Sequence, residues 1–181
     1  MKLVLDASVA LSWLHLPSQP FRSQAMEILN GLYGRPAYVP VVWPLEVAQG
    51  ALRVERAKAA APDVLAQFAL TLWDAPVVHD PRPPTQWLEL SVSLARAHGL
   101  TVYDASYLEL ALSADAALAT FDRKLASAAR TLGVGLAAQT NQLAEPAANY
   151  GENEETVRHE AGAEAAARLS PSIRYTPYFV R

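Results

Sequence analysis

The stretch Lys2-Leu3-Val4-Leu5-Asp6-Ala7-Ser8 joins a short apolar segment to an acid and to the beginning of a helical pattern. Residues 2–5 predict a buried strand, and residues 7–16 predict a helix that ends before Pro17. A strand that passes directly into a helix is the repeating unit of α/β proteins. This stretch therefore sets the expected fold class.

The same order of short strands and longer amphipathic helices continues along the chain. Further strands are predicted at residues 37–39, 77–79, 117–120 and 134–137, and helices at residues 19–33, 42–54, 62–72, 85–98, 101–113 and 122–132. Short strands separated by helices imply a mostly parallel sheet that is covered on both faces. We expect a three-layer α/β/α fold.

Composition narrows the class of protein. The 181 residues, 51% of them hydrophobic and 18% charged, fit one compact domain with an appended segment. No apolar run approaches the roughly 20 residues that cross a bilayer, and an acid at position 6 interrupts the N-terminus too early for a signal peptide. We therefore expect a cytoplasmic protein without a membrane segment.

Charge and cysteine content limit the possible ligands. The net charge of −3 argues against a broadly basic nucleic-acid-binding surface, but it is compatible with a nuclease whose clustered carboxylates hold cations. The chain has no cysteine, and its four histidines lack metal-ligand spacing, so a metal would be held by oxygen. Oxygen ligands favour Mg²⁺, Mn²⁺ or Ca²⁺.

Two acids stand where predicted strands pass into helices. Asp6 and Asp122 should both lie at the carboxyl edge of the sheet, where open α/β folds bind ligands. The alternative for each is an N-cap, in which the carboxylate accepts a hydrogen bond from the first helical turn. Both roles stay open for these residues.

Two further acids lie within predicted helices. Asp104 has capping-box spacing from Thr101, but it also heads an apolar stripe formed by Tyr107, Leu108 and Ala111. A buried carboxylate there needs a cation or strong donors. Glu46 is the only acid between residues 37 and 52, and the alternative for it is an ordinary exposed glutamate. Taken together, the four acids suit oxygen coordination of magnesium.

Four segments occur in the order and at the intervals of a known family: Asp6–Ser8, Pro40–Ala48, Leu100–Tyr107 and Leu118–Leu125. Together they resemble the PIN-domain toxins of bacterial VapBC toxin–antitoxin modules, over about residues 1–138. The resemblance implies a PIN-like fold and an endoribonuclease whose acids hold Mg²⁺ or Mn²⁺. Carried over residue by residue, it gives catalytic and metal-binding roles to Asp6, Glu46, Asp104 and Asp122, and auxiliary roles to the hydroxyls of Ser8 and Thr120. It also implies an RNA substrate, a VapB-type antitoxin and a homodimer.

Basic and aromatic residues are harder to assign. Arg53, Arg123 and Lys124 follow acids of the expected site and could contact RNA phosphates, although solvated helix faces are the alternative. The four tryptophans could stack on bases, but most are expected to be core or interface anchors. These are Trp13, Trp43, Trp73 and Trp87. Asp115 is expected in a turn.

The domain organisation follows from composition. Residues 1–138 are expected to form the PIN-like nuclease domain, and residues 139–181 a C-terminal extension of unknown role. The extension carries Arg174 and Arg181 among aromatic residues, so it could cover the acidic site as an antitoxin segment would. We favour the alternative, an extension without a packed structure.

Two other functions are left open. One is a non-catalytic PIN-like module that binds a protein, which the presence of all four acids disfavours. The other is a Mg²⁺-dependent phosphatase, which needs a second acid two residues after its nucleophilic aspartate. Ser8 stands at that position here.

Overall fold

The structure is a computed structural model and describes residues 2–137. Its strands are β1 (Lys2–Leu5), β2 (Ala37–Val39), β3 (Val77–His79) and β4 (Ala116–Ala119). Its helices are α1 (Ala7–Leu11), α2 (Arg22–Leu32), α3 (Trp43–Arg56), α4 (Pro62–Asp74), α5 (Leu88–His98), α6 (Val102–Ala114) and α7 (Arg123–Thr131), with a 3-10 helix η1 (Pro84–Gln86) before α5. The expected extension, residues 139–181, lies outside the described residues.

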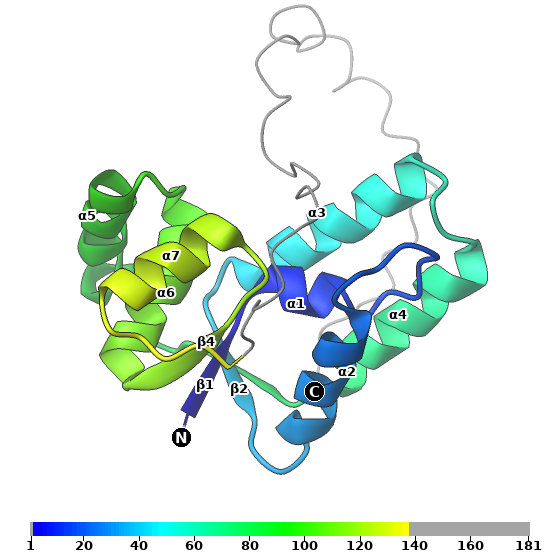
Figure 1. Ribbon diagram of the computed structural model, residues 1–181, viewed down its shortest axis with the longest axis horizontal. Coiled ribbons are helices and arrows are strands. Elements are labelled where there is room, and N and C mark those ends of the chain that lie inside the picture. Colours follow the sequence, from blue (N-terminus) through cyan, green and yellow to red (C-terminus); the bar gives the residue numbers. More distant parts are fainter. Residues whose placement is uncertain (1, 138–181) are drawn as a thin grey trace, which may run out of the picture. The chain divides into compact units, whose positions relative to one another are not determined.

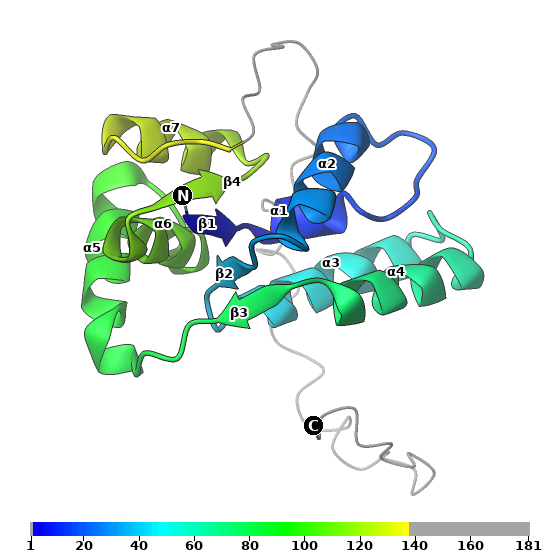
Figure 2. The same cartoon turned by 90° about the horizontal axis from the view of Figure 1, so that it is seen from below.

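The four strands form one parallel sheet in the order β3-β2-β1-β4, which Figure 2 shows from one side. Strand β1 pairs with β4 in a register that sets Leu5 opposite Ala119. The chain builds the sheet outward from β1 through β2 to β3 and then returns to β4 on the other side of β1. The two neighbours β1 and β4 therefore flank the point where the direction of chain progression reverses, which is the usual ligand position in open α/β sheets.

Helices lie in two groups on either side of the strands (Figure 1). Helix α6 packs against β1, β2 and β4, and both α5 and α7 pack on α6. In the other group, α3 packs against α1 and α4. Parallel strands buried between helices are uniformly apolar, and β4 is buried at all four positions. The predicted α/β fold with a parallel sheet is confirmed.

The first predicted helix is too long. It ends at Leu11, and residues 12–16 continue as turns and irregular chain. Trp13 and Leu14 are both buried, and the Trp13 indole N–H donates to the Ala25 carbonyl at 3.0 Å.

The last predicted strand is also reduced. Of residues 134–137, only Leu136 pairs with the sheet, in an isolated parallel bridge to Leu118.

No helix among the described residues has the length and apolar character needed to cross a membrane.

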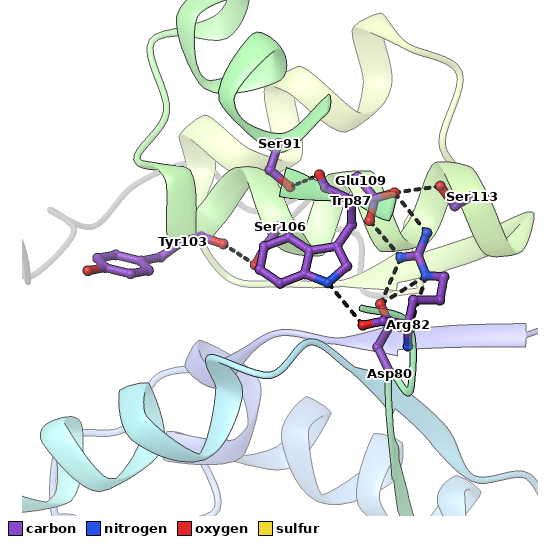
Figure 3. Close-up of polar contacts among 8 residues, drawn as sticks. All are labelled: Asp80, Arg82, Trp87, Ser91, Tyr103, Ser106, Glu109 and Ser113. Carbon is purple, nitrogen blue, oxygen red and sulfur yellow. Dashed lines mark hydrogen bonds and ion pairs between the residues drawn. The ribbon is translucent and has the colours of Figure 1, made fainter. Parts of the chain in front are cut away.

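An ion-pair network fastens the connection after β3 to α6 (Figure 3). The Arg82 guanidinium donates to Asp80 and to Glu109, with shortest distances of 2.7 Å to each carboxylate. Ser113 adds a hydrogen bond to Glu109 at 2.6 Å, and the Trp87 indole donates to the Arg82 carbonyl at 3.2 Å. The two acids are buried, so Arg82 supplies the charge that makes their burial possible.

Replacing Arg82 with Met should lower the free energy of unfolding by about 3 kcal/mol, because two buried carboxylates lose their shared cation. Chemical denaturation at pH 7 measures this value. Arg35→Met, at an exposed position, is the matched control and should change stability by less than about 0.5 kcal/mol. Equal effects of the two substitutions would show that the network does not stabilise the fold.

Candidate active site

Asp6 lies at the carboxyl end of β1, directly beside the end of β4. Its backbone N–H donates to the Ala119 carbonyl at 3.0 Å, which extends the β1–β4 pairing by one residue. Thr120, the residue after β4, therefore faces Asp6 across the strand ends. Because β1 and β4 are paired neighbours, the first and last acidic motifs lie side by side at this edge of the sheet.

The Asp6 carboxylate is held by two hydroxyl groups. Ser8 and Thr120 both donate to Oδ2, at 2.5 Å and 2.6 Å. Each hydroxyl also accepts a backbone N–H from the segment that follows β4, from Phe121 to Ser8 and from Asp122 to Thr120, both at 3.0 Å. These bonds tie Asp6 to the turn that carries Asp122.

The capping alternative for Asp6 is wrong. Asp6 occupies the N-cap position of α1, but its side chain makes no capping hydrogen bond. It is only 5% exposed. The pKa of Asp6 is raised to about 6, chiefly by burial. The hydrogen bonds from the two hydroxyls lower this pKa, and the negative charges of Asp104 and Asp122 raise it further. The charged groups that shift this pKa are all acids, so the carboxylate is buried without a compensating cation among them.

Glu46 lies on α3 and is half-buried, so the alternative of an ordinary exposed glutamate is wrong. The Tyr107 hydroxyl of α6 donates to Glu46 Oε2 at 2.5 Å. Burial raises the pKa of Glu46 to about 7, against the effect of the Tyr107 bond and with added repulsion from Asp6 and Asp104.

Asp104 and Asp122 both serve as parts of helix caps, as the sequence allowed. Thr101 caps α6 by accepting the Asp104 N–H at 3.0 Å, and its hydroxyl donates to Asp104 Oδ2 at 2.7 Å. Asp122 caps α7 by accepting the Leu125 N–H at 2.6 Å. Burial raises the pKa of Asp104; the Thr101 hydroxyl opposes this and the charge of Asp122 adds to it.

The four acids form one electrostatic cluster. Asp6 is repelled by Asp104 and Asp122, Glu46 by Asp6 and Asp104, and Asp104 by Asp122. The hydrogen bonds described above reach Oδ2 of Asp6, Oε2 of Glu46, Oδ2 of Asp104 and Oδ1 of Asp122. None of these bonds engages the second oxygen of any of the four carboxylates.

The carboxylate oxygens of these four acids are suitable ligands for a hard divalent cation. Such cations prefer carboxylate oxygens and often keep several water ligands. Burial, and to a smaller extent repulsion between the acids, raises the pKa of three of them, and a bound cation would oppose both effects. In the present side-chain arrangement, however, no three acids or histidines among residues 2–137 converge closely enough to hold a metal ion. Metal binding at this cluster therefore requires side-chain adjustment or water-mediated contacts.

The basic residues predicted to contact RNA are exposed. Lys124 lies near the cluster, since its positive charge partly opposes the rise in the pKa of Asp104. Arg53 and Arg123 lie on α3 and at the start of α7, and both make interactions of their own. Their role toward RNA stays a prediction.

Other expectations can be compared directly with the structure. Trp13 and Trp43 are core residues, whereas Trp73 is 71% exposed and Trp87 is partly buried. Asp115 ends α6 in the left-handed conformation with a φ of 49°, as expected of a turn residue.

Two polar features were not predicted from the sequence. Tyr107 was expected in an apolar stripe, but its buried side chain bonds to Glu46 through the hydroxyl. The partnership of Asp80, Arg82 and Glu109 was not expected either. The available signal was Glu109 itself, an acid between Leu108 and Leu110 in a helix that is otherwise apolar at this point.

Comparison with known proteins agrees with this architecture. Residues 3–131 match the PIN domain family, which is well over half of the chain, and the chain therefore belongs to this family. PIN domains are mostly metal-dependent nucleases, and they generally bind divalent metals. The family includes toxins of toxin–antitoxin systems.

Two solved structures are similar in fold. The crystal structure of PAE2754 from Pyrobaculum aerophilum is 21% identical, with a TM-score of 0.51, over 71% of this chain and 79% of that chain. The crystal structure of FitAcB from Neisseria gonorrhoeae is 19% identical, with a TM-score of 0.49, over 74% and 95% of the two chains. At these identities the likeness concerns the fold alone. A search of curated proteins finds no significant match.

Replacing Asp6 with Asn should stabilise the metal-free protein at pH 8. The pKa of Asp6 rises from 3.8 to about 6 on folding, so folding favours the protonated acid, and the charged form costs stability as pH rises through this interval. The gain should be small below pH 4 and reach about 3 kcal/mol well above pH 6, because the pKa changes by about two units and one pKa unit corresponds to about 1.4 kcal/mol.

Urea denaturation from pH 4 to pH 8 measures this difference. Asp63→Asn, which changes an exposed acid of α4, is the control and should show little pH-dependent difference. Lower stability of the Asp6→Asn variant at pH 8 would contradict the account of Asp6 burial.

Proposed function

We propose that this protein is a Mg²⁺- or Mn²⁺-dependent endoribonuclease that acts as the toxin of a VapBC-type toxin–antitoxin module. The observation that carries the proposal is the burial of Asp6 beside Asp104 and Asp122, with hydroxyl donors but no cation among the groups that shift its pKa. Membership of the PIN family supports the same assignment. The resemblance of the four acidic motifs to VapBC toxins supports the narrower part of it.

Asp6, Asp104 and Asp122 would hold the ion, with Glu46 at the side of the cluster nearest α3. A bound Mg²⁺ or Mn²⁺ would polarise the scissile phosphate and lower the pKa of a water that attacks in line. The hydroxyls of Ser8 and Thr120 keep the Asp6 carboxylate in one orientation. Lys124, and also Arg53 and Arg123, would contact flanking phosphates of a single-stranded RNA.

Asp104→Asn should reduce metal-dependent RNA cleavage by about 100-fold or more, because a metal ligand contributes several kcal/mol to the transition state and each 1.4 kcal/mol is a factor of ten. Cleavage of total RNA and of a labelled single strand, with MgCl₂, MnCl₂ or EDTA, measures the effect. Circular dichroism checks that the variant is folded.

Asp63→Asn serves again as the control, since it removes a carboxylate outside the cluster, and it should cleave as the wild type does. Cleavage by the wild type in EDTA, or by Asp104→Asn at the wild-type rate, would contradict the proposed function. A folded, metal-binding wild type that cleaves no RNA would favour the non-catalytic protein-binding alternative.

Three further proposals complete the assignment. Residues 1–138 form the nuclease domain, residues 139–181 are an extension that cleavage does not need, and the partners are a VapB-type antitoxin and a second copy of the chain. Loss of cleavage on removal of residues 139–181 would contradict the second. Size-exclusion chromatography with light scattering, with and without a candidate VapB-type antitoxin, tests the third.

A further inference from the structure

Tyr107 is a fully buried tyrosine beside two acids of the cluster, Asp6 and Glu46. It lies on α6, one helical turn after Asp104, and is 0% exposed. Its hydroxyl donates to Glu46 Oε2 at 2.5 Å, across 61 residues of sequence. The bond therefore links α6, which carries Asp104, to α3, which carries Glu46.

The surroundings of this hydroxyl are those of the site itself. Burial raises the pKa of Tyr107, the carboxylates of Asp6 and Glu46 raise it further, and the Ala7 N–H at the start of α1 opposes them. Tyr107 therefore remains a neutral hydrogen-bond donor at neutral pH. The hydroxyl lies where α1, α3 and α6 meet, within electrostatic reach of two of the four acids.

We infer that Tyr107 is a positioning residue that holds the Glu46 carboxylate toward the acid cluster for metal binding, an inference that rests on the proposed function. A half-buried glutamate on a helix has three rotatable bonds and can turn its carboxylate toward solvent. The Tyr107 bond restricts Glu46 through Oε2, and Oε1 is not engaged by it. Partners that orient a metal ligand in this way usually affect metal affinity strongly.

A purely structural role for Tyr107 would come from its ring, which fills space in the core with Leu108 and Ala111 of the same helix. Tyr107→Phe keeps the ring and removes only the hydroxyl, so it separates packing from positioning. Tyr33→Phe is the matched control, because Tyr33 also donates to a carboxylate, Asp74 at 2.9 Å, but at an exposed position.

The experiment measures Mn²⁺ binding by isothermal titration calorimetry for the full-length wild type and for four variants. These are Tyr107→Phe, Glu46→Gln, the double variant with both substitutions, and Tyr33→Phe. Tyr107→Phe should raise the Kd for Mn²⁺ about tenfold, and Tyr33→Phe should leave it unchanged. In the Glu46→Gln background, the loss of the Tyr107 hydroxyl should have no further effect.

Wild-type Mn²⁺ affinity in folded Tyr107→Phe would overturn the inference, and so would an equal loss with and without the Glu46 carboxylate. If Tyr107→Phe does not fold, Tyr107→Met replaces it, because Met also lacks the hydroxyl and adapts its shape to the core. A wild type that binds Mn²⁺ but cleaves no RNA contradicts only the proposed function. A wild type that binds no Mn²⁺ at millimolar concentration contradicts both.

Discussion

The hydrogen bonds that Ser8 and Thr120 donate to the buried Asp6 carboxylate are the contacts on which the rest of the site depends. They form only if α1 begins immediately after β1 and if β1 and β4 pair so that Leu5 lies opposite Ala119. The same hydroxyls accept the backbone N–H groups that lead into Asp122. A single buried carboxylate therefore fixes both strand ends and the start of α7.

A comparison of Asp6 with Asp80 shows why position at a strand end is not enough to define such a site. Asp80 follows β3, and its N–H donates to the Val39 carbonyl, so it ends a strand in the same way as Asp6. Burial favours a raised pKa for Asp80, but the hydrogen bonds and charge of Arg82 outweigh it and lower the pKa. Asp80 thus has a permanent cation from the protein, whereas the groups that shift the pKa of Asp6 are two hydroxyls and two other acids.

Much of the fold follows from local patterns in the sequence. Strands β1, β2 and β3 have the predicted bounds, and α6 differs from its prediction by one residue at each end. The fold class needed only the alternation of strands and helices. The shortened α1 was not predictable in this way, because its end depends on the burial of Trp13 against a distant helix.

In the candidate site too, some features follow from the local sequence and others depend on contacts between distant residues. All four acids were identified from their sequence context, and the structure brings each of them within electrostatic reach of at least two others, which for Glu46 are Asp6 and Asp104. Asp104 and Asp122 take part in helix caps and also belong to the acid cluster. A local capping pattern therefore could not show whether either residue belongs to the site. The partners Tyr107 and Arg82 were missed because their bonds span 61 and 27 residues, and nothing in the local sequence encodes such a contact.

The central claim is that the cluster around Asp6 binds a divalent cation. The most direct measurement is the anomalous difference map of a crystal soaked in MnCl₂. The account predicts a peak about 2.1 Å from carboxylate oxygens of Asp6 and of at least one of Asp104 and Asp122, a distance typical of small hard cations. A map from millimolar Mn²⁺ with no peak near Asp6, or with peaks only at other surface acids, would contradict it.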